Sequence, residues 1–332
     1  MNHIIRLTSI APEFQSKILQ QLSSNDVATS STTLDCTHID HDTTILGVFV
    51  DSCVTKEVIA SMPHLEHIVT FSTGYDHIDL AAAKKKKISV SNIPFYGENT
   101  VAEHALALIL GLSRKLYPSI KRVKEGVYDY HNLQGFDLKD KMVGIIGTGH
   151  IGIHAIKMLK GFDVHINAFD AFPNQALAKE YGFSYEPLDQ ILQQSDIISL
   201  HVPLLPSTKH IIDMKAVKKM KPGIHIINTS RGGLIEPAAL LFGLQNRIIA
   251  GAGLDVLEEE SIFKSPEMIL SLNDPKEIRQ SLIENAIIDH PNTIITPHNA
   301  FNSIEAMNRI IDTAIDNIKN FIKGSPTNLI KL

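Results

Sequence analysis

The chain of 332 residues has few of the features that mark secreted, metal-binding or membrane proteins. Its two cysteines, Cys36 and Cys53, have neither disulfide-framework nor metal-ligand spacing, which predicts a reducing compartment and no metal site. The first residues, MNHIIRLTSI, lack the charged and apolar regions of a secretory signal. No apolar run reaches the roughly 18 residues that a membrane span needs. We therefore expect a cytoplasmic protein without a membrane partner.

The chain also lacks an excess of basic residues. It carries 31 lysines and arginines against 36 aspartates and glutamates, and its net charge is -5. One dense basic run, at residues 84–87, follows three alanines and is typical of a solvated helix end. Proteins that bind nucleic acid need a basic surface to neutralise the phosphates, so we expect no nucleic-acid partner.

Apolar runs alternate with helical stretches along most of the chain, which is long enough for two domains. The first part of the pattern predicts strands at 4–8, 44–50, 67–72 and 88–92, with helices at 12–22, 56–62 and 80–86. The second part predicts strands at 142–146, 164–169, 196–200, 224–228, 249–254 and 293–296, with helices at 150–160, 173–181, 188–193, 214–220 and 237–245. This alternation predicts parallel sheets, and six strands with crossover helices are typical of a doubly wound dinucleotide-binding domain.

Two further helices set the expected domain boundaries. An apolar helix at residues 99–116, with Asn99 as its N-cap, separates the two patterns. An amphipathic helix at residues 303–323 is expected to return to the first domain, because chain ends often lie close together. We expect an α/β protein in which residues 1–98 and 300–332 form one domain and residues 99–299 form the other.

A glycine-rich turn gives the cofactor prediction. Residues 142–152 read MVGIIGTGHIG, an apolar strand followed by the turn and a helix. Gly147 permits the tight turn, Gly149 lets the backbone approach a pyrophosphate, and Gly152 lets the helix pack closely. The anion is expected to meet the amides at the helix N-terminus, which belong to Thr148, Gly149, His150 and Ile151.

An acid at the end of the next predicted strand refines that prediction. The carboxylate of Asp170 can accept hydrogen bonds from the ribose hydroxyls of an adenosine, and it would repel a 2′-phosphate. The residues that follow, Ala171, Phe172 and Pro173, offer no arginine to hold such a phosphate. The sequence therefore predicts NAD as the cofactor.

Polar groups follow three later strands, at the edge where open α/β sheets bind ligands. In residues 228–233 (NTSRGG), the planar guanidinium of Arg231 suits bidentate recognition of a carboxylate. Residues 254–260 (LDVLEEE) place Asp255 at a strand end and Glu260 among three acids that spacing alone does not separate. Residues 296–301 (TPHNAF) contain His298, a side chain suited to proton transfer near neutral pH. A carboxylate such as Glu260 would favour the charged imidazole.

These stretches give the chain a resemblance to a known family. It resembles the D-isomer-specific 2-hydroxyacid dehydrogenases over nearly its whole length, in residues 72–80 (STGYDHIDL), 99–106 (NTVAEHAL), 147–152 (GTGHIG), 201–206 (HVPLLP), 228–233 (NTSRGG), 253–260 (GLDVLEEE) and 296–301 (TPHNAF). The resemblance implies a Rossmann-type NAD-binding domain inserted in a smaller flavodoxin-like substrate domain. It also implies a homodimer, in which the helix from Asn99 packs across a twofold axis.

The resemblance further implies an activity and a role for each residue. The activity is hydride transfer between NADH and C2 of a small 2-keto or 2-hydroxy acid, with D configuration. Arg231 would bind the substrate carboxylate and carbonyl, His298 would donate a proton to the carbonyl oxygen, and Glu260 would orient and charge His298. Further cofactor contacts would come from Val202, Pro203, Thr208, Thr229, Ser230 and Asp255. Further substrate contacts would come from the amides of Thr73 and Gly74, and from Tyr96 and Phe301.

The substrate is less closely defined than the reaction. Three features resemble those of D-lactate dehydrogenases and favour lactate and pyruvate. They are the pocket residues Tyr96 and Phe301 and the helix-like insertion at residues 281–288. Phe71 stands where lactate enzymes tend to have arginine, and an aromatic residue that they often have near residues 51–53 is absent. Glyoxylate, hydroxypyruvate, a longer keto acid, formate and phosphite are therefore alternatives, although an acid at Glu260 disfavours formate. An NADH-sensing binding protein is the alternative of another class.

Overall fold

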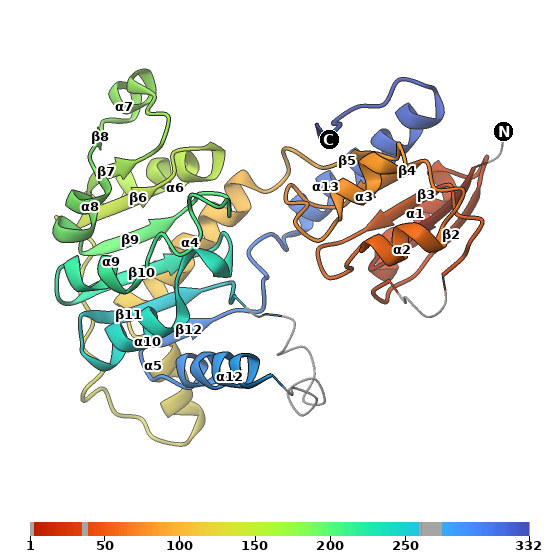
Figure 1. The fold of residues 1–332 in the computed structure, drawn as a ribbon. Helices are drawn as coiled ribbons and strands as arrows, with labels where there is room; N and C mark the ends of the chain where they lie inside the picture. The colour runs from red at the N-terminus through yellow and green to blue at the C-terminus, as the bar shows by residue number, and fades with distance from the viewer. Residues whose placement is uncertain (1–2, 35–38, 259, 261–273, 332) are drawn as a thin grey trace. The chain divides into compact units, whose positions relative to one another are not determined.

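The computed structural model describes residues 3–34, 39–258, 260 and 274–331 (Figure 1). Cys36 lies outside these residues. The chain divides into two compact units: unit 1 comprises Met1–Tyr96 and Ser303–Leu332, and unit 2 comprises Gly97–Asn302. The division falls close to helix caps, because Gly97 is the N-cap of α4 (Glu98–Ser113) and Ser303 is the N-cap of α13 (Ile304–Ile322). Among the described residues, no helix is long and apolar enough to cross a membrane.

Unit 1 is built on a five-stranded parallel sheet with the order β2-β1-β3-β4-β5. The strands are β1 (Ile4–Leu7), β2 (Asp26–Thr29), β3 (Ile45–Val48), β4 (His67–Thr70) and β5 (Ser89–Ser91). The helices between them are α1 (Pro12–Gln21), α2 (Lys56–Ser61) and α3 (Leu80–Lys85). Every residue of β3 and β4 is buried, as expected where helices cover both faces of a parallel sheet. This strand order is the flavodoxin-like one, so the predicted fold of the smaller domain is confirmed.

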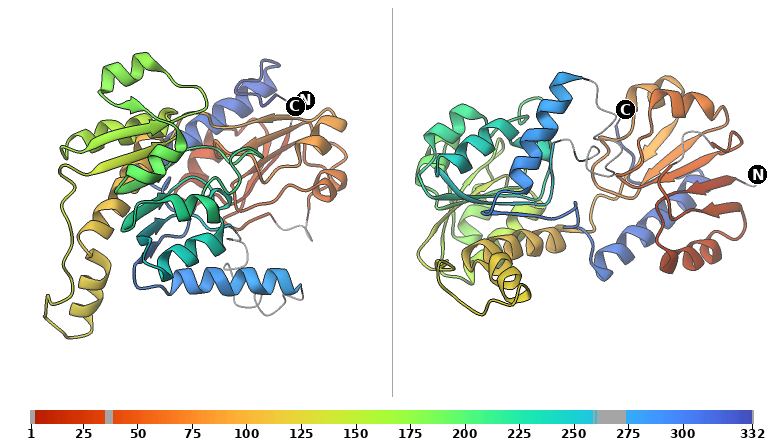
Figure 2. Two further views of the ribbon diagram at one scale, coloured as in Figure 1. Left: turned by 60° about the vertical axis from the view of Figure 1, so that its left-hand side comes forward. Right: turned by 90° about the horizontal axis from the view of Figure 1, so that it is seen from below.

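The last helix of the chain packs on this sheet. α13 lies against β4 and α1, as the views in Figures 1 and 2 show. Asn317 donates a hydrogen bond to the carbonyl of Asn92 (3.0 Å), and the ring of Phe321 stacks on His67 with 4.3 Å between the ring centroids. The apolar face of α13 thus completes the core of unit 1, although more than two hundred residues separate it from β5.

His67 makes the stability of unit 1 sensitive to acid. Its ring has no exposed surface and lies between the hydroxyls of Ser89 (2.8 Å) and Ser91 (3.0 Å). Burial lowers the pKa of His67 to about 4, against a small opposing effect of Ser89. The unfolded chain therefore takes up this proton at a higher pH than the folded chain, so stability falls as the pH drops from about 6.5 to about 4.

We expect His67→Gln to flatten this part of the pH profile. Urea unfolding at pH 7 and pH 5 measures the free energy of unfolding at each pH. The loss between them should be smaller in the variant than in the parent by about 2 kcal/mol, because the titrating ring is gone. An equal loss in both proteins would show that His67 does not carry the effect.

Unit 2 is built on a seven-stranded parallel sheet with the order β12-β11-β10-β9-β6-β7-β8. Its strands are β6 (Met142–Ile146), β7 (His165–Phe169), β8 (Ser184–Tyr185), β9 (Ile197–Leu200), β10 (Ile224–Asn228), β11 (Ile249–Leu254) and β12 (Thr293–Ile295). The chain moves outward from β6 to β8 and then returns to the other side of β6 with β9. Such a switch point leaves a crevice at the carboxyl ends of the central strands, where dinucleotides bind. The predicted doubly wound fold is confirmed.

Helices cover both faces of this sheet (Figure 2). Those not yet named are α5 (Leu116–Lys124), α6 (His150–Lys160), α7 (Gln175–Tyr181), α8 (Leu188–Gln194), α9 (Met214–Lys219), α10 (Pro237–Gln245) and α12 (Pro275–Ile288). Two expectations were wrong. Gly97, not Asn99, occupies the N-cap of α4. The side-chain amide of Asn99 donates a hydrogen bond to the carboxylate of Glu103 one turn further along the helix. The helix predicted at residues 99–116 ends at Ser113, and a separate helix that was not predicted, α5, follows it.

Candidate active site

The glycine-rich turn connects β6 to α6 at the switch point. Gly147 has a φ of 98°, and a Cβ there would lie 2.7 Å from the carbonyl of His201, which follows β9. A Cβ on Gly152 would lie 2.0 Å from the oxygen of Gly147. Only glycine fits at these two positions, so the turn is kept tight by contact between backbones.

The part of the turn that faces a ligand is open. A Cβ on Gly149 would meet no atom within 4 Å, and the N-terminus of α6, which begins at His150, has no side-chain cap. Uncapped amides at a helix N-terminus suit an anion such as a pyrophosphate. The amide of Thr148 is an exception among the predicted donors, because it donates to Asp170 (2.7 Å).

Asp170 follows β7 and is held as a charged group. Its carboxylate accepts hydrogen bonds from the amide and hydroxyl of Thr148 (2.7 and 2.9 Å) and from the amide of Phe172 (2.9 Å). Burial alone would raise the pKa of Asp170, but these hydrogen bonds outweigh it and hold the pKa below its ordinary value. A carboxylate that stays charged suits ribose hydroxyls and opposes a phosphate in the same place.

His298 and Glu260, the predicted acid–base pair, contact each other in unit 2. Nδ1 of His298 lies 2.9 Å from Oε2 of Glu260, and both side chains are partly exposed. The structure thus selects Glu260 as the partner, which spacing could not do. A carboxylate at Nδ1 fixes the ring so that Nε2 is the nitrogen available for proton transfer. His298 also has a φ of 51°, a strained conformation for this residue that recurs at functional sites.

Asp255 holds the loop that carries His298. It is 1% exposed, and its carboxylate accepts hydrogen bonds from the hydroxyl of Thr296 and from the amides of Asn299 and Ala300 (both 2.8 Å). Its carbonyl accepts the amide of His298 (2.8 Å). Nε2 of His104, on α4, lies 3.0 Å from the Thr296 hydroxyl and 3.4 Å from the Asp255 carboxylate. This geometry gives Asp255 a supporting role, and its contact with the nicotinamide stays a prediction.

Arg231 lies in a turn after β10, the strand between β9 and β11. The side chain of Asn228 braces this turn by donating to the carbonyl of Arg231 (2.9 Å) and accepting the amide of Ser230 (3.0 Å). The hydroxyl of Ser230 in turn bonds to the carbonyl of Leu200 (2.9 Å). Arg231, Glu260 and His298 therefore all follow the carboxyl ends of adjacent strands in unit 2.

The remaining predicted cofactor contacts lie near the same edge of the sheet. The hydroxyl of Thr229 is buried and has no hydrogen-bond partner among the described residues. Such a group costs free energy until a ligand or water bonds to it, so it fits a cofactor contact. Val202 and Pro203 follow β9, and the hydroxyl of Thr208 stabilises their loop by bonding to the carbonyl of Pro203 (2.6 Å). Together with the open turn at Gly149, these groups fit a dinucleotide.

In unit 1, the predicted substrate loop follows β4. The hydroxyl of Thr73 donates to the carbonyl of Ile93 (2.7 Å), and the hydroxyl of Ser72 donates to the carbonyl of Gly74 (2.6 Å). No described residue accepts a hydrogen bond from the backbone amide of Thr73 or of Gly74, so both amides are available to an anionic ligand. Tyr96 ends this part of unit 1, where its carbonyl accepts Nε of Arg309 (2.7 Å). Phe301 is the penultimate residue of unit 2.

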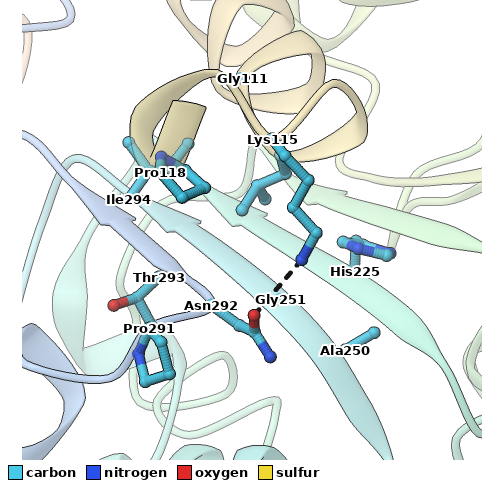
Figure 3. A pocket seen from close by; sticks show the side chains of 11 residues that line it. Gly111, Lys115, Pro118, His225, Ala250, Gly251, Pro291, Asn292, Thr293 and Ile294 are labelled. Atoms are coloured by element: carbon cyan, nitrogen blue, oxygen red, sulfur yellow. Dashed lines mark hydrogen bonds between the residues drawn. The ribbon is translucent and has the colours of Figure 1, made fainter. Parts of the chain in front are cut away.

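A separate small pocket lies at the opposite ends of the strands in unit 2 (Figure 3). It is lined by His225, Gly251 and Thr293, from the amino-terminal parts of β10, β11 and β12. Nζ of Lys115 crosses it and donates to Oδ1 of Asn292 (3.3 Å). Because ligands of such sheets bind at the carboxyl ends, this pocket is not the candidate active site. No group of three or more potential metal ligands occurs among the described residues.

Comparisons with known proteins agree with this geometry. The model of the family described as "D-isomer specific 2-hydroxyacid dehydrogenase, NAD binding domain" matches residues 106–300. D-lactate dehydrogenase of Escherichia coli is 33% identical over 279 residues, which cover 83% of each chain. Glycerate dehydrogenase of Methylorubrum extorquens is 37% identical over 281 residues, which cover 83% of this chain and 82% of the relative.

The chain belongs to the D-isomer specific 2-hydroxyacid dehydrogenase family. A D-lactate dehydrogenase from Aquifex aeolicus, solved with NAD and lactic acid, superposes with a TM-score of 0.87 and 32% identity, covering 97% of this chain and 96% of that one. The predicted family, enzyme class and NAD cofactor are confirmed. The structure adds four supporting residues to which the sequence had assigned no role: His104, Asn228, His210 and Glu258.

Proposed function

We propose that this enzyme reduces a small 2-keto acid to the D-2-hydroxy acid, with pyruvate and D-lactate as the preferred pair. The observation that carries this proposal is the hydrogen bond between His298 and Glu260, on a loop beside the Arg231 turn and the dinucleotide crevice. The names of the relatives support both lactate and glycerate chemistry.

The proposed mechanism assigns one task to each polar group. The Gly147–Gly152 turn and Asp170 would hold NADH, which when bound would supply the hydride for C2. Arg231 binds the substrate carboxylate and draws electron density toward the carbonyl oxygen. His298, oriented by Glu260, donates its proton to that oxygen from Nε2. The amides of Thr73 and Gly74 provide further donors for the carboxylate, and Tyr96 and Phe301 contact the group on C3.

Glyoxylate and hydroxypyruvate are the alternative substrates, and one observation supports them. Phe71 is 1% exposed and packs on Phe49, with 5.0 Å between the ring centroids. The position before the predicted carboxylate-binding loop is therefore a buried apolar side chain, where lactate enzymes tend to have an arginine.

Oxidation of NADH with a panel of keto acids tests the proposed function. The panel contains pyruvate, glyoxylate, hydroxypyruvate, phenylpyruvate, 2-ketobutyrate and oxaloacetate. We expect turnover with the highest kcat/KM for pyruvate. A higher kcat/KM for glyoxylate or hydroxypyruvate would show that this keto acid, and not pyruvate, is the preferred substrate. Binding of NADH without turnover of any member would favour an NADH-sensing protein instead.

We also propose that the enzyme is a homodimer, in which the helix from Asn99, placed at the twofold axis by the family resemblance, is joined in the interface by α5 and the segment that follows it. No residue of α5 is buried, and this part of unit 2 exposes the large apolar side chains Leu116, Tyr117, Ile120, Val123, Val127, Tyr128 and Tyr130. Tyr128 is 95% exposed. Monomeric proteins seldom expose so large an apolar surface, whereas interfaces are rich in tyrosine.

The double variant Ile120→Asp/Tyr128→Asp should dissociate this dimer. Two buried charges without partners would oppose association. Sedimentation velocity should show a dimer for the parent and a monomer for the variant. Leu19→Asp, on α1 of unit 1, is the matched control and should stay dimeric. A dimeric double variant, or a monomeric parent, would rule out this surface.

A further inference from the structure

A second histidine–glutamate pair lies behind the Arg231 turn and has no task in the proposed mechanism. Nε2 of His210 lies 2.9 and 3.1 Å from the two carboxylate oxygens of Glu258. His210 belongs to the loop after β9, and Glu258 follows β11. Since β10 separates β9 from β11 in the sheet, backbone hydrogen bonds between strands do not join these two loops directly. The pair joins them across the turn that follows β10.

The loops that carry His210 and Glu258 both contact the Arg231 turn. The amide of His210 donates to the carbonyl of Gly233 (2.8 Å). A Cβ on Gly232 would lie 2.0 Å from the carbonyl of Leu257, and a Cβ on Gly233 would lie 3.6 Å from the Glu258 carboxylate. The turn therefore lies in close contact with the segment that leads to Glu260, and a shift of Glu258 would move both.

Helix α12 extends the same network. Nε2 of Gln280 lies 3.5 Å from Oε2 of Glu258 and 3.3 Å from Oε1 of Glu284. Glu284 has no exposed surface, and a buried carboxylate is costly unless it takes part in hydrogen bonds. Glu284, Glu258 and Gly232 line one small cavity together with Asn228, which bonds to the carbonyl of Arg231. Polar groups thus extend from α12 to the base of the Arg231 turn.

We propose that His210, Glu258 and Gln280 are positioning residues for the reaction. They hold the Arg231 turn in register with Leu257 and Glu258, which follow β11, so that the guanidinium and the acid–base pair meet the same substrate. None of them touches a reacting atom. This inference rests on the proposed function, because it takes the roles of Arg231 and Glu260 from it.

The variants Glu258→Leu and His210→Phe test the inference. Each should lower kcat/KM for pyruvate by about 100-fold, the size expected when a catalytic group is displaced by about 1 Å. Binding of oxamate, an unreactive analogue of pyruvate, to the NADH complex should weaken in parallel, while the Kd of NADH should change little. Isothermal titration measures both affinities. Glu258→Gln keeps an acceptor for His210, so this variant should retain most of the kcat/KM that Glu258→Leu loses.

The double variant shows whether the pair acts as one unit. If it does, Glu258→Leu/His210→Phe should lose no more than the worse single variant, because the second change removes nothing that is still intact. Asp189→Asn, which breaks the exposed pair with Lys219 in the same unit, is the control and should keep the parent kcat/KM. Thermal melting establishes that each variant is folded.

Two results would overturn the inference. One is an unchanged kcat/KM in a folded Glu258→Leu enzyme. The other is an equal loss of NADH and oxamate affinity that follows the melting temperature, because general destabilisation would explain it. Failure of the proposed function would look different: the parent enzyme itself would turn over no keto acid, or the folded Arg231→Gln enzyme would keep the parent kcat/KM, whatever Glu258 does.

Discussion

Replacing Arg231 by glutamine should lower kcat/KM for pyruvate by about 30- to 5,000-fold, since losing one partner of a desolvated charge pair costs about 2–5 kcal/mol. The guanidinium offers two parallel donors to the substrate carboxylate. No other described arginine lies in the loops that follow the strands of the unit 2 sheet. Steady-state rates of NADH oxidation measure the effect. The Kd of NADH should remain near the parent value, because the turn at Gly147 lies after another strand.

The lysine variant separates charge from geometry. Arg231→Lys keeps the positive charge but presents it as a point, so it should recover only part of the loss. Full recovery would mean that bidentate geometry is not needed. A glutamine variant within a few-fold of the parent would remove Arg231 from the substrate site.

Replacing His298 by glutamine should lower kcat by about 100- to 10,000-fold, the range that proton transfer by a positioned side chain contributes. Glutamine cannot donate a proton to the carbonyl oxygen, although it can still bond to Glu260. KM should change less than kcat, because the substrate carboxylate is bound elsewhere. Glu260→Gln should lower kcat by a smaller factor, since the ring keeps a hydrogen-bond partner but loses the charge beside it.

A surface histidine provides the control for this experiment. His165 is exposed at the start of β7, at the opposite end of the strand from Asp170. His165→Gln should therefore leave kcat and KM unchanged. If His298→Gln retained the parent kcat, another group would have to supply the proton.

The sequence predicted those parts of the molecule that depend on local patterns. The strand, glycine turn and helix from Met142 follow from the spacing of apolar residues and glycines, because only glycine fits where backbones touch. Asp170 was predicted because a residue at the end of β7 must lie beside the turn. The polar edge strand β2, half exposed, and the two-residue strand β8 have too little apolar pattern for such a prediction.

Features that depend on contacts distant in the chain could not be predicted. The helix cap at Gly97 has no polar side chain that would identify it. Leu116, Ile120 and Val123 of α5 have helical spacing, but α5 contains Pro118 and is separated from α4 by a left-handed residue, Lys115, which no sequence pattern marks. Spacing could not distinguish Glu258, which bonds to His210, from Glu260, which bonds to His298. The packing of β9, β10 and β11 side by side decides which acid meets which histidine.

The configuration of the product tests the central claim most directly. The enzyme is incubated with pyruvate and NADH, and the lactate is separated by chiral chromatography. We expect D-lactate in an amount equal to the NADH consumed. L-lactate, a racemic product, or NADH consumption without lactate would contradict the proposed reaction at Arg231 and His298.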